Sequence, residues 1–383
     1  MRIHPVRLPR AARVLTAAAV STALLGACAF QDEGDVSGAI AVAASDTACD
    51  VERSQADAGT VKFTVRNEGS KVTEFYVYAP GDRIMSEVEN IGPGLSRDLL
   101  VELPAGEYET ACKPGMRGKG IRNGFTVTGA AEPQKDSDAQ LKAATESYRR
   151  YVTSQTKALV ERTTEFVAAV KAGDTENAKQ LFPVSRVYFE RIEPIAGSFG
   201  DLDPAIDERE DDPGLAGPEF TGYHRIEKAL WQDNNLADMG PIADRLLADV
   251  TELDRLSNSE LDLTPLDLAN GSKGLLDEVT VGKITGEEDR YSHTDLWDFD
   301  ANVDGSKAAI TSLRPVLEAE DAKLLATIDE RFAAVENELA KHERGDGYRL
   351  HTELSEAELK ELATVLSALS ESVGQVAAVV AAR

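Results

Sequence analysis

The hydrophobic pattern of the chain changes its period once, and this change limits the folds that the chain can adopt. Before about residue 129, apolar residues alternate with polar ones, as at Val61, Phe63 and Val65. After about residue 138, they recur at three- and four-residue steps, from Leu141 and Ala144 onward. A period of two is typical of half-buried strands, and a period of 3.6 is typical of amphipathic helices. The sequence therefore predicts an all-β domain followed by an all-α domain.

A run of small and polar residues over 129–138 reads as the linker between the two domains. In the first domain, over 39–128, runs such as 72–78 and 99–103 are rich in strand-forming residues and are separated by turns that contain Gly, Pro or Asn. This spacing indicates a small β-sandwich. The apolar stripes of the second domain, over 139–383, indicate a helical bundle.

The chain begins with a segment that has the composition of an export signal. Arginines precede an apolar run over 14–25, which ends in Leu25-Gly26-Ala27-Cys28. We interpret residues 1–27 as a signal peptide. The small residues before Cys28 resemble a bacterial lipobox, so we expect lipid on Cys28, a tether over 28–38, and a mature chain outside the cytoplasm that is anchored to the cell membrane. An ordinary signal cleavage, with Cys28 incidental, is the alternative. We expect no later segment to span a membrane.

The net charge narrows the range of partners. The chain has 67 acidic and 41 basic residues, and its formal net charge is −26. Such a surface repels a phosphate backbone, which argues against general nucleic-acid binding. Carboxylate oxygens are the ligands that hard metal cations prefer, so the same composition suits cation binding.

The β-domain has few residues that could hold a metal. A type-1 copper site needs two histidines, and no histidine lies between His4 and His224. Cys49 and Cys112 remain, and they could form a disulfide in an oxidising compartment. The other interpretation is a metal site in which one or both thiolates act together with Glu74 or Met116, and the soft sulfur would favour copper.

The helical domain contains a spacing that is typical of metal ligands. His224 and Glu227 are three residues apart, so on a helix both side chains can reach one ion. The alternatives are an ion pair on the helix surface or a core histidine. An inverted zinc-peptidase motif would need a second histidine where Lys228 stands, so the peptidase interpretation lacks a ligand. We interpret His342 and His351 as surface residues.

Two acidic segments could contribute to the same site, and a third is better explained as a loop. Glu190 and Glu193 have the spacing of one helix face, and residues 286–300 contain Asp289 within a dense group of acidic and histidine side chains. A solvated acidic turn is the alternative for 286–300. Residues 201–212 lack the glycine that an EF-hand loop needs at its sixth position, so we predict a solvated loop there.

Several segments of the chain resemble one known family, the EfeO-type iron-uptake proteins. The helical part resembles their imelysin-like domain at 188–196 (YFERIEPIA), 220–230 (FTGYHRIEKAL) and 286–299 (GEEDRYSHTDLWDF). The β-part is similar to the cupredoxin-like domain of that family at 72–78, 87–93 and 104–112. The resemblance therefore covers nearly the whole mature chain.

The resemblance implies a metal site in the helical domain. The family motif G-x-H-x-x-E falls on Gly222, His224 and Glu227, and the family pattern implies three further ligand candidates, Glu190, Glu193 and Asp289.

The resemblance also implies a second site and a set of partners. In the β-domain it suggests copper or iron at Cys49, Glu74 and Cys112, although Cys112-Lys113-Pro114-Gly115 departs from the family pattern after the second cysteine. The family's implied role is that of the extracytoplasmic component of a ferrous-iron uptake system. It works beside an iron permease in the membrane and a haem-dependent peroxidase.

We therefore predict a lipid-anchored protein that captures ferrous or ferric iron and passes it to a membrane permease. The alternative function is a metal-dependent enzyme, either a ferroxidase that uses copper in the β-domain or, with less support, a metallopeptidase. In a third interpretation the β-domain is a docking face, and Cys49 and Cys112 only stabilise it.

Overall fold

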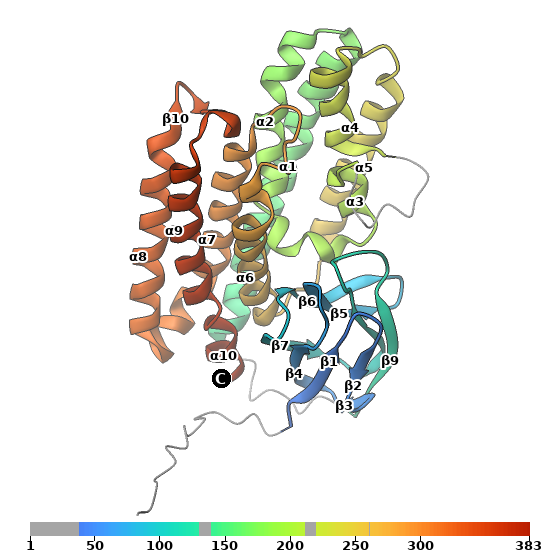
Figure 1. The fold of residues 1–383 in the computed structure, drawn as a ribbon, viewed down its shortest axis with the longest axis vertical. Coiled ribbons are helices and arrows are strands. Elements are labelled where there is room, and N and C mark those ends of the chain that lie inside the picture. Colours follow the sequence, from blue (N-terminus) through green and yellow to red (C-terminus); the bar gives the residue numbers. More distant parts are fainter. Residues whose placement is uncertain (1–37, 130–138, 211–219, 260) are drawn as a thin grey trace, which may run out of the picture. The chain divides into compact units, whose positions relative to one another are not determined.

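The computed structural model describes residues 38–129, 139–210, 220–259 and 261–383 (Figure 1). The predicted signal peptide, Cys28, the tether up to residue 37 and the linker from residue 130 lie outside the described residues. Strands come first along the chain and helices follow. This confirms the predicted fold class, a β-sandwich domain followed by an all-helical domain.

The β-domain is a sandwich of two sheets. One sheet has the strand order β2-β1-β4-β7, and the other has the order β3-β9-β8-β5-β6. Most neighbouring strands are antiparallel, whereas β1 pairs with β4 and β3 pairs with β9 in parallel. The strands are β1 (Ile40–Ala44), β2 (Cys49–Val51), β3 (Gln55–Asp57), β4 (Gly59–Asn67), β5 (Thr73–Ala79), β6 (Arg83–Ile91), β7 (Ser96–Leu103), β8 (Gly106–Cys112) and β9 (Ile121–Thr128).

Aromatic side chains from both sheets fill the core of the sandwich. The ring of Phe63 on β4 lies 5.2 Å from that of Phe75 and 5.4 Å from that of Phe125, measured between ring centroids. A disulfide between Cys49 on β2 and Cys112 on β8 also links the two sheets. The alternation seen in the sequence thus becomes one buried face on each sheet.

The helical domain is built around the long helix α1. The residues that recur at three- and four-residue steps from Leu141 to Val170 lie on α1, and all of them are buried. The α-helices are α1 (Ala139–Ala172), α2 (Thr175–Glu190), α3 (Leu202–Asp207), α4 (Gly222–Lys228), α5 (Gly240–Ser259), α6 (Pro265–Val281), α7 (Asp295–Glu320), α8 (Ala322–Leu339), α9 (Glu356–Val373) and α10 (Val376–Ala381).

Short elements connect these helices. Residues 229–233 form one π-helical turn, η2 (Ala229–Asp233). The small hairpin of β10 (Glu343–Arg344) and β11 (Gly347–Tyr348) lies between α8 and α9. The 3-10 turns are η1 (Glu193–Phe199), η3 (Lys283–Thr285), η4 (Ala340–His342) and η5 (His351–Glu353).

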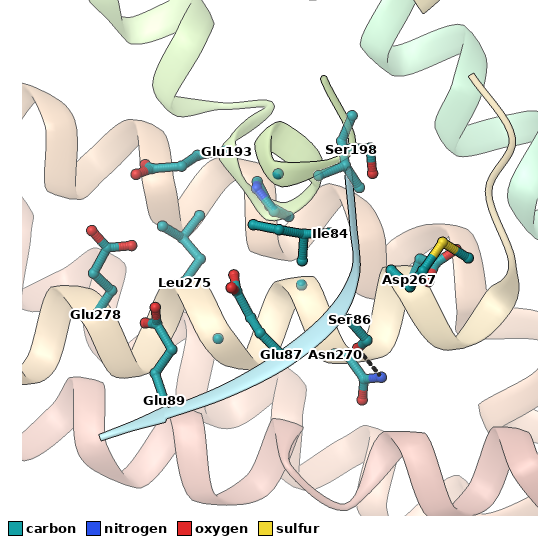
Figure 2. Close-up of a pocket in the computed structure, with 16 residues that line it drawn as sticks. Ile84, Ser86, Glu87, Glu89, Glu193, Ser198, Asp267, Asn270, Leu275 and Glu278 are labelled. Carbon is teal, nitrogen blue, oxygen red and sulfur yellow. Dashed lines mark hydrogen bonds between the residues drawn. The ribbon is translucent and has the colours of Figure 1, made fainter. Parts of the chain in front are cut away.

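Helix α6 contacts the β-domain at strands β6 and β7, and η1 also contacts β6. The side-chain amide of Asn270 on α6 donates to the carbonyl oxygen of Leu100 at 2.6 Å and to Ser86 Oγ at 3.2 Å (Figure 2). These polar contacts fix α6 to two neighbouring strands.

One helical segment among the described residues, Glu356–Ala381, is long and apolar enough to cross a membrane. Our expectation that no later segment would meet this criterion is therefore wrong. Core helices meet the same criterion, and Leu362, Leu366 and Leu369 of this segment are buried in the core of the helical domain. Packing within the protein accounts for its apolar character.

Two further expectations about the helical domain are wrong. The first part of the predicted solvated loop at 201–212 is helix α3, and Ile206 anchors it in the core. His342 and His351 are buried, not exposed. His351 Nε2 lies 3.0 Å from the carbonyl oxygen of Ile284, so this ring nitrogen has a hydrogen-bond partner inside the protein.

Candidate metal centre

Helix α4 carries His224 and Glu227, and its first residue brings it against α3. Gly222 has a φ of +77°, which residues with a Cβ rarely adopt. A Cβ at this position would lie 2.2 Å from the carbonyl oxygen of Ile206. The glycine of the motif therefore allows α4 to start in contact with the end of α3. This contact brings Asp207, the last residue of α3, beside His224.

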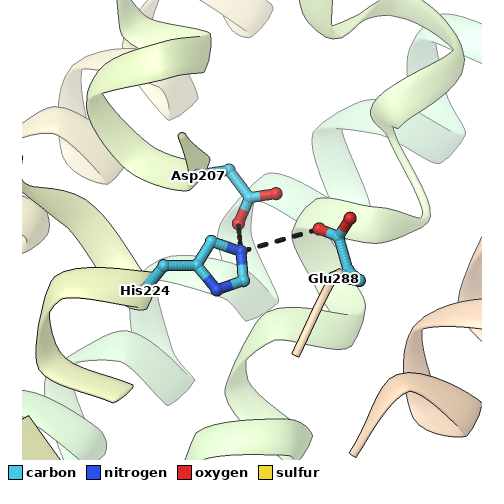
Figure 3. A group of neighbouring side chains, drawn as sticks. All are labelled: Asp207, His224 and Glu288. Carbon is cyan, nitrogen blue, oxygen red and sulfur yellow. Dashed lines mark ion pairs between the residues drawn. The ribbon is translucent and has the colours of Figure 1, made fainter. Parts of the chain in front are cut away.

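The two ring nitrogens of His224 face different carboxylates. Nε2 lies 3.7 Å from Asp207 Oδ1 and 3.5 Å from Glu288 Oε1 (Figure 3). Nδ1 lies 2.9 Å from Glu227 Oε2, and a carboxylate oxygen of Asp289 completes a second group of three. In each group the candidate ligand atoms lie within 4.8 Å of one another. The structure thus brings the predicted residues His224, Glu227 and Asp289 together.

Glu227 is bound on both of its oxygens. Its Oε2 faces His224, and its Oε1 accepts from the backbone N–H of Tyr291 at 3.0 Å and of Ser292 at 2.7 Å, and from the Ser292 hydroxyl at 2.9 Å. Burial raises the pKa of Glu227, but the hydrogen bond from His224 and these backbone donors lower it below its usual value. Glu227 is therefore a fixed carboxylate that orients the imidazole ring.

A wholly buried arginine lies on the Nε2 side of the imidazole. Arg186 on α2 donates through Nη1 to His224 Nε2 at 2.6 Å and to Asp207 Oδ1 at 2.8 Å. Its Nη2 donates to Glu190 and, at 3.2 Å, to Glu288 Oε1. One guanidinium group therefore holds together side chains from α2, α3, α4 and the segment before α7.

The contact with Arg186 decides the protonation of His224. Burial and the guanidinium of Arg186 lower the pKa of His224, whereas the carboxylates of Glu227, Glu288 and Asp207 raise it. An imidazolium, however, would point a second N–H donor at Arg186 Nη1 across 2.6 Å. Two donors cannot share that distance, so the neutral ring is the form that fits this geometry. Its Nδ1–H points to Glu227 and its Nε2 lone pair points to Arg186.

A second buried cation binds the two predicted glutamates. Lys283 Nζ, on η3, donates to Glu193 Oε1 and Oε2 at 2.8 Å each and to Glu190 Oε2 at 3.0 Å. The side-chain amide of Asn302 also donates to both glutamates, at 2.9 Å and 2.7 Å. Glu190 and Glu193 do lie together as predicted, but α2 ends at Glu190 and Glu193 begins η1. Their shared partners are Lys283 and Asn302, and neither glutamate contacts His224 through a hydrogen bond in the described residues.

Three buried aspartates of this cluster keep carboxylate oxygens that accept no hydrogen bond within the described part of the chain. These atoms are Asp289 Oδ1, Asp295 Oδ2 and both oxygens of Asp298. Arg186 Nη2 lies 3.5 Å from Asp298 Oδ2, and its Nε lies 3.9 Å from Asp289 Oδ1, without a hydrogen bond in either case. Buried oxygens without partners are costly, so these atoms are candidate ligands for a cation.

The charges of the cluster are out of balance. Burial raises the pKa of Asp207 to about 8, of Asp289 to about 6 and of Asp295 to about 8. Burial also raises the pKa of Glu190, but Lys283 and Arg186 together lower it to about 2. Carboxyl groups outnumber the buried cations, so the cluster must either hold protons or take up further positive charge.

Comparisons with known proteins agree with this architecture. The imelysin family model matches residues 144–375, and a cupredoxin-like domain model matches residues 15–122. The chain is 40% identical over 360 residues to proteins named "Iron uptake system component EfeO". These come from Escherichia coli strain 536, Escherichia coli strain K12 and Shigella flexneri, and each match covers 93% of this chain and 95% of the relative.

The chain belongs to the EfeO-type imelysin family. The relatives are named as iron uptake components and not as enzymes. In this chain, Gly222 of the family motif is the first residue of α4, and it lies against the end of α3.

This imelysin-family chain has a second acidic site, where β6 meets α6 and η1. Glu87 and Glu89 on β6, Glu193 on η1 and Glu278 on α6 line a cavity of about 90 Å³ (Figure 2). Burial raises the pKa of Glu87 to about 7. Glu193 belongs both to this cavity and to the Lys283 group, so the two acidic sites adjoin.

The structure does not bring Glu74 together with the two cysteines. Cys49 and Cys112 form a disulfide inside the sandwich core. Phe75 lies in the same core, and successive strand residues point to opposite faces, so Glu74 faces away from it. Its Oε2 accepts from the Tyr76 hydroxyl at 3.2 Å. A disulfide offers no thiolate to a copper ion, so this arrangement gives no support to a copper site at these three residues.

Sequence reasoning missed Arg186, Lys283 and Asp207 as members of the centre. A usable signal existed for Arg186, because it falls between Phe182 and Phe189 on the buried stripe of α2. A charged residue within an apolar stripe indicates a buried partner of opposite charge. No comparable signal marked Asp207, because its role depends on the long-range contact between α3 and α4.

Proposed function

We propose that this chain is an iron-binding component of an iron uptake system, and that it captures iron at His224 and passes it to a membrane permease. The observation that carries the proposal is the geometry of His224. Glu227 orients its imidazole, and the carboxylates of Asp207 and Glu288 lie 3.7 Å and 3.5 Å from its Nε2. An imidazole fixed by a carboxylate on its far nitrogen is the arrangement that metal-binding histidines use.

The donor set supports iron as the ion. One imidazole nitrogen and several carboxylate oxygens suit ferrous or ferric iron better than ions that require thiolates. His224 Nε2, Asp207 and Glu288 would bind the ion directly, with Asp289 as a further ligand. Glu227 would hold the ring and stabilise its charge. The relatives' printed name, an iron uptake system component, supports the same choice of ion.

The delivery step belongs to the same proposal. Lipid on Cys28 would tether the chain to the outer face of the cell membrane, next to the permease that receives the iron. A haem-dependent peroxidase of the same system is the second proposed partner. An anchored carrier needs a site that also releases its ion, so the proposal predicts moderate affinity.

Anaerobic equilibrium dialysis of the mature chain against ferrous iron, ferric iron, Cu²⁺ and Zn²⁺ tests the capture step. The double variant His224→Ala/Glu227→Ala should lose one equivalent of iron. His342→Gln, which changes a buried histidine outside the cluster, is the matched control and should bind iron as the wild type does. If the double variant and the wild type bind iron alike, the site is not at His224.

A further inference from the structure

Arg186 occupies the position from which an ion would reach His224. Its guanidinium is wholly buried, and Nη1 lies 2.6 Å from His224 Nε2. The same group hydrogen-bonds to Asp207 and Glu288, the two carboxylates that face Nε2. Three of the four ligands proposed for iron, His224, Asp207 and Glu288, are therefore hydrogen-bond partners of one arginine. An arginine side chain stays charged at any pH that the protein meets.

The guanidinium satisfies this cluster only in part. Its own Nε makes no hydrogen bond within the described residues, and it lies 3.9 Å from Asp289 Oδ1. The oxygens of Asp298, 3.5 Å away at the closest, also lack a donor in the described part of the chain. A planar group with fixed N–H directions cannot reach every surrounding oxygen. A metal ion of higher charge has no such directional limit, so it could recruit the oxygens that Arg186 leaves unpaired.

We propose that Arg186 is the counter-ion of the centre whenever no iron is bound, and that iron displaces its guanidinium from His224 Nε2 when it binds. The inference rests on the proposed function and adds a regulatory part to it. In the empty protein, Arg186 keeps the buried carboxylates from repelling one another. In the loaded protein, the displaced guanidinium remains close enough to compete for the same ligands, and this competition lowers iron affinity and favours release.

Arg186→Gln tests the inference, with Lys283→Gln as the matched control. Both substitutions remove one wholly buried positive charge from the same carboxylate cluster. Lys283 hydrogen-bonds to Glu190 and Glu193, however, while Arg186 bonds to His224. We expect both variants to lower the stability of the iron-free protein. We expect Arg186→Gln to tighten iron binding about tenfold or more beyond Lys283→Gln, because one charge-assisted hydrogen bond no longer competes with the ion. Equal affinities in the two variants, or weaker binding in Arg186→Gln than in the wild type, would overturn the inference.

A crystal structure of the iron-loaded wild type shows whether iron displaces Arg186 from His224, even if Arg186→Gln does not fold. The inference predicts that Arg186 Nη1 has left hydrogen-bond distance of His224 Nε2, and that the ion takes its place. An ion bound through His224 with the guanidinium contact unchanged would overturn this inference and leave the proposed function standing. An ion bound away from His224 would overturn both.

Discussion

At the scale of single residues, the centre depends on a glycine as much as on its ligands. Gly222 has a positive φ and touches the backbone of Ile206, so any side chain there forces α3 and α4 apart. We expect Gly222→Ala to lower the free energy of unfolding by about 1–3 kcal/mol and to weaken iron binding. Urea unfolding measures the first effect, and equilibrium dialysis measures the second.

Gly274→Ala is the matched control for this substitution. Gly274 lies in the interior of α6, and an added Cβ would meet no atom within 4 Å. Alanine is favoured over glycine inside helices, so we expect this variant to gain about 0.5–1 kcal/mol. If Gly222→Ala were as stable as the wild type, the close approach of α3 and α4 would not be what holds the centre.

The carboxylate behind His224 gives a second prediction at this scale. Glu227→Gln keeps the size of the side chain but removes the charge that fixes and polarises the imidazole. Losing such an orienting partner typically weakens metal binding about 10–100-fold, so we expect a decrease of that size in iron affinity. Isothermal titration with ferrous iron under anaerobic conditions measures it. An unchanged affinity would show that Glu227 does not act through His224.

The sequence predicted some residues of the metal centre and not others. The spacing of His224 and Glu227 indicated a shared ligand position, and both side chains do meet. Their counter-ions were missed. The position of Arg186 on the buried stripe of α2 was a usable signal, whereas the burial of Lys283 among carboxylates becomes apparent only in the fold.

At the scale of elements, we expect the disulfide between β2 and β8 to affect stability and not the metal centre. It closes a loop with a sequence separation of 63 residues inside the sandwich. We expect Cys49→Ser/Cys112→Ser to lower the free energy of unfolding by about 2–5 kcal/mol. Iron binding at His224 should stay within about twofold of the wild type. Dialysis of the double variant checks this, and a loss of iron would assign a metal role to the cysteines.

Two acidic residues, Glu87 on β6 and Asp203 on α3, give a pH prediction. Burial is the main cause that raises the pKa of Glu87 to about 7 and that of Asp203 to about 7, each above its usual value of about 4. Between pH 4 and 7 the folded state therefore keeps protons that the unfolded chain releases. The free energy of unfolding should fall as the pH rises through this window, by at most about 1.4 kcal/mol per group and pH unit.

Glu87→Gln isolates this effect. Unfolding is measured at pH 5, 6, 7 and 8 in the presence of a chelator, and the difference between wild type and variant cancels the contribution of titrating groups that do not interact with Glu87. The variant should lose less stability on going from pH 5 to pH 8 than the wild type does. Equal losses in the two proteins would show that Glu87 does not hold a proton in the folded state.

The elements also differ in how far local sequence predicts them. The stripe of α1 and the alternation of β4 are local patterns, and both were predicted. Helix α3 was not, because its acidic residues suggested a solvated loop, whereas Ile206 and Leu202 pack it against the core. Glu190 and Glu193 were predicted on one helix face, but the chain leaves α2 between them and enters η1.

At the scale of the whole molecule, the order of the two domains followed from the change in hydrophobic period. The contact between them did not, because it depends on single polar residues such as Asn270, which bonds to Leu100 and Ser86. The net charge of −26 had suggested cation binding in general terms. The fold concentrates part of this charge in two adjoining acidic sites that share Glu193.

Iron K-edge X-ray absorption of the protein, loaded with one equivalent of iron, tests whether His224 and carboxylate oxygens bind the ion. We expect a first shell of oxygen and nitrogen with the outer-shell scattering of one imidazole, and we expect His224→Gln to lose that imidazole signal. A sulfur shell around the iron, or a spectrum that His224→Gln leaves unchanged, would show that iron does not bind at His224.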